Sequence, residues 1–325
     1  TCADTIAADN TILSGWEVGD ELILQIYDWA FIINSGTAAG NVEDSYRDIS
    51  FCLKEHVLTP PPGTTFVPDD NFEQYLIDQG YDDVLDNYVV TANINTVIGI
   101  NIAFKNISNL LGIEDFTALR FLYAYDNQLS NINVTQNTAL EVLEINMNNI
   151  SSIDITQNTL LRNFDMDNNP LTTIDLTQNP ALEIANFRDC QLSSIDVSQN
   201  QLLEEIRLSE NYQLTSIDVS SNPNLRTISF IDCPVTNIDV SNNLALKIIF
   251  SSGSLVSHID VSGNPILESL ICQNSPALTS LNVQNGNNSN FTAFLAVNTP
   301  NLVCVQVDDV AYSTATWTSV DAGIN

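Results

Sequence analysis

Alternating apolar and polar residues recur along this chain at a nearly fixed interval. The phrase Ile-Asp-Val-Ser-Gln-Asn, or a close variant, begins at positions 132, 153, 174, 195, 217, 238 and 259, and a shorter copy begins at 281. Consecutive copies are therefore 21 or 22 residues apart. A coil of this length can bury its apolar side only against its neighbours, so the period predicts a solenoid.

A second phrase, Leu-x-x-Leu-x-Leu-x-x-Asn, precedes each of these copies. It begins at Leu119, Leu140, Leu161, Leu182, Leu203, Leu225, Leu246 and Leu267. In both phrases alternate residues are apolar, which is typical of strands that bury one face. We therefore predict an α/β-type but β-dominated repeat, with roughly nine or ten coils and two strand faces.

An asparagine ends most copies of each phrase. Stacked amide side chains can bond the backbone of adjacent coils where the chain turns, so we expect two columns of Asn. The first column contains Asn127, Asn148, Asn169 and Asn211, with Cys190 and Cys233 in place of Asn. The second contains Asn137, Asn158, Asn179, Asn200, Asn222, Asn243 and Asn264.

The repeat does not extend over the whole chain. The predicted order is a small N-terminal segment of unknown role (1–58), a Pro-rich linker (59–63), an N-terminal helical cap (64–95), the repeats (96–285), and a last coil with a C-terminal cap (286–325). The cap helix is predicted because Asp70 to Glu73 has the spacing of a capping box and Gly80 can end a helix. Caps are expected because the terminal coils of a solenoid must be covered.

Charge and length narrow the classes of partner. The 325 residues include 40 acidic and 9 basic side chains, for a formal charge of −31. Nucleic acids and anionic membranes require clustered Lys and Arg, so neither is expected as a partner. No apolar run reaches the roughly 18 residues of a membrane span. The chain begins at Thr1 without Met or a signal peptide, so we expect a processed chain.

Six cysteines are present, without the spacing of a metal site. Cys2 and Cys52 bracket the N-terminal segment and are predicted to pair, which would fit an oxidising location. Cys190 and Cys233 lie two coils apart, roughly 9–10 Å at strand spacing. This exceeds the Cα separation of about 7 Å that a disulfide can span. We therefore interpret them, with Cys272, as buried thiols.

Four motifs outside or within the repeats are distinctive: residues 67–74, residues 113–119, the repeated Ile-Asp-Val-Ser-Gln-Asn, and residues 305–312 together with Trp317. With these motifs the chain resembles the secreted or cell-surface leucine-rich repeat proteins of flavobacteria and other Bacteroidetes. The resemblance implies export, often to the cell surface, and non-catalytic adhesion or recognition. We predict that the fold is a right-handed leucine-rich repeat solenoid. Similar chains often carry a further cysteine beyond this region, which leaves the partner of Cys304 open. Residues 1–58 lie outside the resemblance.

Outward positions of the first phrase differ from coil to coil, as a recognition surface requires. Aromatic and Arg side chains dominate binding hot spots, which favours one end of this surface. The predicted ligand-binding residues are Phe121, Tyr123, Tyr125, Glu144, Asn146, Asp165, Asp167, Asn186, Arg188 and Arg207. Aromatic faces flanked by Asp and Asn also suit sugar rings. The alternative is neutral variation on a solvated sheet.

Outward positions of the second phrase are instead nearly constant. They form a row of aspartates: Asp154, Asp175, Asp196, Asp218, Asp239 and Asp260. At a spacing of roughly 4.8 Å these carboxylates repel one another. Hydrogen bonds from the adjacent Ser/Thr column, raised pKa values or bound cations could each offset the repulsion. Calcium is the specific metal hypothesis. A solvated, hydrogen-bonded row is the interpretation we favour, so no cofactor is predicted.

No motif of a catalytic site is present: the chain has no GxSxG, no HExxH, no phosphate loop and only two histidines. We therefore predict that the chain is not an enzyme. The predicted function is an extracellular recognition or adhesion module that binds a protein or polysaccharide. The alternatives are an accessory binding domain of a larger polysaccharide-degrading enzyme and a purely structural surface stalk.

Overall fold

The computed structural model describes residues 21–26, 29–34 and 61–321. The chain divides into two compact units, residues 1–62 and residues 63–325. In the first unit, β1 (Glu21–Ile26) and β2 (Trp29–Asn34) form an antiparallel pair. Cys2 and Cys52 lie outside the described residues, so their disulfide stays a prediction.

A short hairpin and two helices begin the second unit. β3 (Thr64–Phe66) pairs with the antiparallel β4 (Tyr88–Val90), and α1 (Asp70–Asp78) and α2 (Thr91–Ile94) contact this pair. The apolar side of α1 is buried in the core of the solenoid. Gly80 follows α1 at a φ of 76°, a left-handed conformation that Gly adopts easily at a helix end.

The N-cap of α1 is Asp69, one residue before the predicted capping box. Its Oδ1 accepts two backbone N–H groups of the first turn, both at 3.1 Å. Its Oδ2 accepts the N–H groups of Ser108 and Asn109 at 2.8 and 3.0 Å. The N-cap is therefore Asp69 and not Asp70, because the Asp69 carboxylate bonds both the first turn of α1 and the backbone of the first coil.

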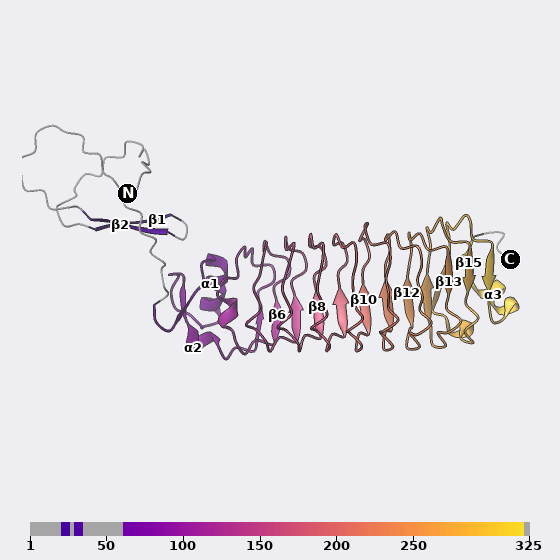
Figure 1. The fold of residues 1–325 in the computed structure, drawn as a ribbon, viewed down its shortest axis with the longest axis horizontal. Helices are drawn as coiled ribbons and strands as arrows, with labels where there is room; N and C mark the ends of the chain where they lie inside the picture. Colours follow the sequence, from indigo (N-terminus) through magenta and orange to yellow (C-terminus); the bar gives the residue numbers. More distant parts are fainter. Residues whose placement is uncertain (1–20, 27–28, 35–60, 322–325) are drawn as a thin grey trace, which may run out of the picture. The chain divides into compact units, whose positions relative to one another are not determined.

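Ten parallel strands of three residues each form the main sheet (Figure 1). From the N-terminal end they are β5 (Gly99–Asn101), β6 (Phe121–Tyr123), β7 (Val142–Glu144), β8 (Asn163–Asp165), β9 (Ile184–Asn186), β10 (Glu205–Arg207), β11 (Thr227–Ser229), β12 (Ile248–Phe250), β14 (Ser269–Ile271) and β16 (Ala293–Leu295). Neighbouring strands are in register, so that Tyr123 lies opposite Glu144. The result is the β-dominated solenoid that the 21–22-residue period predicts.

The middle residue of every strand is buried in one continuous core. These residues are Ile100, Leu122, Leu143, Phe164, Ala185, Ile206, Ile228, Ile249, Leu270 and Phe294. Cys190, Cys233 and Cys272 are free, buried thiols, as the sequence predicts. Burial raises the pKa of Cys190 and Cys272 to about 12 and that of Cys233 to about 11, so these thiols stay protonated at neutral pH.

The second sheet is shorter than predicted. Only the last coils form it, with the parallel strands β13 (His258–Asp260), β15 (Ser280–Asn282) and β17 (Cys304–Gln306). In the earlier coils the second phrase carries no strand. There the chain turns at once within its own coil: the Thr156 N–H binds the Asp154 carboxylate, and the Asn158 N–H binds the Ile155 carbonyl. The coil of β13 makes the same two local bonds, from the Ser262 N–H to Asp260 and from the Asn264 N–H to Val261, so these bonds alone do not prevent pairing. The last coils differ because they add bonds between coils, such as the Val261 N–H to the Asn282 carbonyl at 2.8 Å.

Both Asn columns hold the coils together, as predicted. In the second column each amide is fully buried and donates to two carbonyls of the preceding coil, except that Asn285 at its end donates to one and is 8% exposed. In the first column, Asn169 donates to the carbonyls of Ile145 and Met166 and accepts the Ile150 N–H. The thiol of Cys190 makes two long contacts instead, of 3.5 Å to the Met166 carbonyl and 3.7 Å to the Arg188 carbonyl.

The C-terminal end is closed by aromatic packing. η1 (Ile113–Asp115) and η2 (Asn288–Asn290) are single turns, and α3 (Val310–Thr316) is the last helix. After α3, Trp317 stacks on Phe294 with ring centroids 4.2 Å apart. Among the described residues no helix is long and apolar enough to cross a membrane.

Candidate ligand-binding face

The outward side chains of the ten-stranded sheet form three columns, which together we call the strand face. Strand pairing aligns the first and third residue of each strand with those of the next coil. Backbone bonds such as Asp126 N–H to the Asn146 carbonyl extend the alignment two residues further. All ten predicted ligand-binding residues occupy these columns, between Phe121 and Arg207. Four of them line two hollows of the strand face: Phe121 and Tyr123 line the first, and Arg188 and Arg207 line the second.

The first hollow, called the aromatic hollow, lies at the N-terminal end of the strand face. It has a volume of about 370 Å³ and is lined by Gly99, Ile100, Asn101, Phe121 and Tyr123. A side chain at Gly99 would contact the Phe121 ring, so the glycine keeps the hollow open. The two aromatic walls and one polar side chain make it suited to a flat, partly apolar group.

Phe104, which was not predicted from the sequence, adds an exposed ring next to Tyr125 on the strand face. The turn after each strand holds one residue in the left-handed region, with φ between 48 and 70°: Phe104, Asp126, Met147, Asn168, Asp189, Glu210, Asp232, Gly253, Asn274 and Asn298. Asn, Asp and Gly adopt this conformation most easily. Phe104 is nevertheless 65% exposed and lies edge-on to Tyr125, with centroids 5.2 Å apart. An aromatic ring at a strained, exposed position favours a contact function.

Glu144, Asp165 and Asp167 form an acidic patch next to the aromatic hollow. Burial raises the pKa of all three, and repulsion by Asp165 adds to the effect at Glu144 and Asp167. Asn186 donates to Asp165 at 3.2 Å, and Asn163 donates to Glu144 at 3.3 Å. No ion pair to these carboxylates occurs within the described part of the chain.

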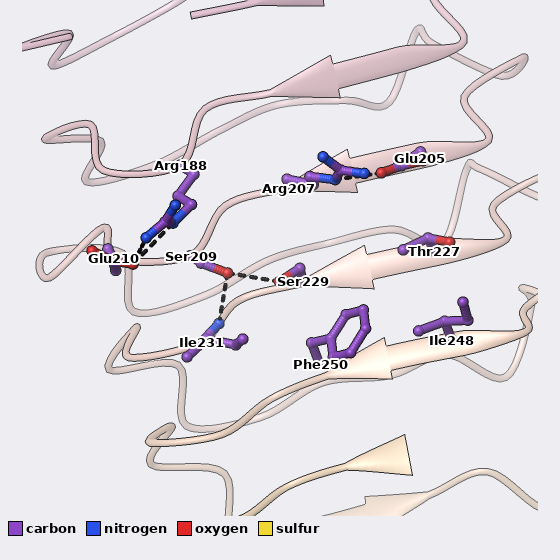
Figure 2. A pocket seen from close by; sticks show the side chains of 10 residues that line it. All are labelled: Arg188, Glu205, Arg207, Ser209, Glu210, Thr227, Ser229, Ile231, Ile248 and Phe250. Carbon is purple, nitrogen blue, oxygen red and sulfur yellow. Dashed lines mark hydrogen bonds and ion pairs between the residues drawn. The ribbon is translucent and has the colours of Figure 1, made fainter. Parts of the chain in front are cut away.

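The second hollow, called the central hollow, lies over β10, β11 and β12 (Figure 2). Its volume is about 480 Å³, and its lining is Arg188, Glu205, Arg207, Ser209, Glu210, Thr227, Ser229, Ile231, Ile248 and Phe250. Arg188 donates to Glu210 through Nε at 2.9 Å, and Arg207 pairs with Glu205. On the opposite side Phe250 and Ile248 form an apolar wall (Figure 2). The hollow is therefore polar on one side and apolar on the other.

Most other basic side chains are used to join coils. Four ion pairs form one column beside the strand entrances: Arg120–Glu141, Arg162–Glu183, Arg226–Glu204 and Lys247–Glu268, with N–O distances of 2.7 to 3.3 Å. Arg120 also lies over the Phe121 ring, 5.1 Å from its centroid. This column uses four of the nine Lys and Arg residues. Arg188 and Arg207 lie instead on the strand face, where their guanidinium groups line the central hollow.

The aspartate row is supported by hydrogen bonds, one of the three predicted explanations. In every coil the carboxylate accepts the N–H of the Ser or Thr two residues later, at 2.9 Å. These bonds lower the pKa of Asp154, Asp175, Asp196, Asp218 and Asp239. At Asp260 burial opposes the same bonds, and the pKa is still lowered. The alternative of raised pKa values is therefore wrong.

A calcium row stays a hypothesis. Among the residues that the structure describes, no group of three or more His, Cys, Asp or Glu side chains is arranged to hold a metal ion. The aspartates follow one another along a straight row, whereas calcium prefers six to eight oxygens around one point.

Comparison with solved structures identifies the type of solenoid. No family model and no curated protein matches the chain. Among solved structures, it is similar to the functional domain of InlJ from Listeria monocytogenes, which includes a cysteine ladder, with a TM-score of 0.61 and 24% identity over 74% of this chain. The chain spans 63% of the length of that domain. Internalin C2 of the same organism gives a TM-score of 0.54 and 14% identity, over 77% of this chain and 99% of that one.

The fold is a leucine-rich repeat solenoid. On this solenoid the predicted residues fall into two groups. Phe121 and Tyr123 line the aromatic hollow, Tyr125 follows on the same coil, and the acidic patch lies on the next two coils. Arg188 and Arg207 line the central hollow, three and four coils from Tyr123. Asn186 lies between the groups but is only 8% exposed, so it supports Asp165 more than it faces solvent.

Sequence reasoning missed most of the central hollow of this leucine-rich repeat chain. The missed lining residues are Glu205, Ser209, Glu210, Thr227, Ser229, Ile231, Ile248 and Phe250. A signal was present: the small Thr227 and Ser229 lie in register between the large pairs Glu205 and Arg207 on one side and Ile248 and Phe250 on the other. A dip in side-chain size across three coils marks a hollow.

Proposed function

We propose that this leucine-rich repeat chain is a non-catalytic recognition module that binds a macromolecular partner through the strand face. The observation that carries the proposal is the pair of hollows on one continuous sheet whose outward residues change from coil to coil. Both hollows combine aromatic or Arg side chains with polar ones, the composition of binding hot spots. The partner is an extracellular protein or a polysaccharide. Export is supported by the resemblance of residues 67–74 and 305–312 to secreted chains.

A catalytic function finds little support in the geometry. His258 bonds Ser280 through Nδ1 at 2.7 Å, but this pair is exposed on the second sheet and lines neither hollow. Carboxylates on neighbouring coils always lie at strand spacing, so their separation gives no evidence for a glycosidase pair. Binding explains the strand face without a reaction.

The test compares the chain with a double variant, Tyr123→Ala and Tyr125→Ala, on a glycan array and in capture of purified surface proteins. Tyr212→Ala is the matched control, because Tyr212 is 65% exposed and lines neither hollow. We expect the double variant to lose binding by about tenfold or more, the scale of a lost hot spot, while the control keeps it. Equal binding by all three chains, or hydrolysis of any glycan, would contradict the proposal.

A further inference from the structure

We infer that the central hollow binds a neutral sugar ring, so that the partner of the strand face is a glycan with uncharged pyranose units. This inference rests on the proposed recognition function and names the chemical class of its ligand. The evidence comes from the shape of the hollow, the charge balance of its polar wall, and the chemistry of its floor and apolar wall.

The hollow is a trough that follows β11. Thr227 and Ser229 are small, whereas the residues beside them on β10 and β12 are large. The walls therefore stand two strand spacings apart, about 9.6 Å between backbones. A volume of about 480 Å³ lies within the range of roughly 300–1,000 Å³ that is typical of sites for small ligands. One ring fits such a trough, whereas a helix of about 10 Å diameter does not.

The polar wall has no net charge. Its two guanidinium groups, on Arg188 and Arg207, are each paired with a carboxylate, on Glu210 and Glu205. The opposite charges of each pair cancel, so the wall offers no net attraction to an anion or to a cation, and a charged ligand would have to compete with one member of a pair for its partner. A hydroxyl group both donates and accepts, so a neutral polyhydroxylated ligand can bond guanidinium and carboxylate together without breaking either pair.

The floor offers hydroxyl groups. Ser209 and Ser229 are 4% and 7% exposed, and their Oγ atoms are 2.6 Å apart. The Ser209 Oγ also accepts the Ile231 N–H at 3.1 Å (Figure 2). These bonds fix the positions of both oxygens at the base of the trough. A ligand with hydroxyl groups along its edge can replace the water that otherwise hydrates this floor and the polar wall.

The apolar wall completes the match to a sugar. Phe250 lies in register beside Ser229, and Ile248 beside Thr227. A pyranose presents an apolar C–H face and a polar edge, the same division that the trough shows between this wall and the ion pairs. The phenyl ring of a Phe from a protein partner could fill the same space, but it would cover the Glu205 carboxylate without giving it a hydrogen bond, and the lost hydration of that carboxylate would oppose its binding.

The experiment uses the full chain and a panel of neutral tetrasaccharides (cellotetraose, maltotetraose, mannotetraose and chitotetraose), with tetragalacturonic acid as the charged probe. Binding is measured by saturation-transfer NMR and titration calorimetry. Phe250→Ala removes the aromatic wall and Thr227→Phe fills the trough. Ile248→Ala and Ile184→Ala are matched, because they remove the same side chain from the same column, inside and outside the hollow. Circular dichroism checks that each variant folds.

We expect at least one neutral tetrasaccharide to bind, and the three hollow variants to weaken it by about tenfold or more, as for a central contact. Ile184→Ala should bind within about twofold, as peripheral contacts do. The inference is overturned if no neutral probe binds, if only tetragalacturonic acid binds, or if Phe250→Ala and Ile184→Ala behave alike. If no sugar binds but a surface protein is still captured through Tyr123 and Tyr125, the sugar inference alone is wrong; if neither binds, the recognition function is wrong as well.

Discussion

Replacement of Asn200 by Ala tests how the second Asn column joins the coils. Asn200 is fully buried, and its Nδ2 donates to the carbonyls of Leu176 at 3.0 Å and of Asn179 at 2.8 Å. Both carbonyls belong to the preceding coil. The substitution removes these two bonds and leaves the backbone of Asn200 in place. It therefore changes one coil-to-coil junction.

The size of the expected loss of stability depends on the hydrogen bonds that the two carbonyls retain after the substitution. The Leu176 carbonyl still accepts the Asn179 N–H, and the Asn179 carbonyl still accepts the Leu182 N–H, each at 3.1 Å. Neither becomes an unpaired buried acceptor, so the net value of an ordinary hydrogen bond applies, about 0.5–1.5 kcal/mol each. The sum is about 1–3 kcal/mol. If both carbonyls were instead left without any hydrogen-bond donor, the loss of stability would be about 2–6 kcal/mol.

Urea unfolding followed by far-UV circular dichroism measures this loss. Gln199→Ala is the control, since Gln199 is the exposed neighbour and bonds only Ser198. We expect the control within about 0.5 kcal/mol of the wild-type chain, as for a surface substitution. Because each coil contacts only its neighbours, Asn200→Ala should also broaden the transition. Equal free energies of unfolding for the two variants would refute the reasoning.

Four further predictions concern charge. Hydrogen bonds lower the pKa of Asp196, so Asp196→Asn should reduce the melting temperature at pH 7, and the difference should vanish as the pH falls below the ordinary carboxyl value near 3.8. Burial raises the pKa of Asp165, so Asp165→Asn should increase the melting temperature at pH 7 and lose that gain in acid. If both substitutions changed the melting temperature in the same direction at pH 7, the opposite pKa shifts of Asp196 and Asp165 would be contradicted. Millimolar calcium or a chelator should leave the melting temperature unchanged, and a clear shift would support the metal row instead. Glu183→Gln should change stability by less than about 1 kcal/mol, because the Arg162 pair is largely exposed.

The sequence was informative where one residue type repeats in a fixed place. The leucines at each first phrase and the Asn columns determine which residues lie inside, and strand register then follows. The outward columns were predictable for the same reason, since a period of two places alternate residues on opposite faces. Tyr123, Glu144 and Asp165 therefore align as expected.

Features that depend on several coils at once could not be read from single phrases. The central hollow exists because Ser229 is small while Arg207 and Phe250 are large, a comparison across three coils. The second sheet is short because only the last coils make bonds between coils there, such as the Val261 N–H to the Asn282 carbonyl. The phrase is nearly identical in coils with and without a strand, so it does not reveal this difference. Asp69 was missed as a cap because its second oxygen binds Ser108, far along the chain.

A crystal structure of the chain with the tetrasaccharide or surface protein that binds it most tightly tests the central claim most directly. The account predicts that the ligand lies on the strand face, in contact with Tyr123 at the aromatic hollow or with Phe250 at the central hollow. A ligand seated on the aspartate row around Asp196, or on the C-terminal cap around Trp317, with the strand face still in solvent, would contradict it.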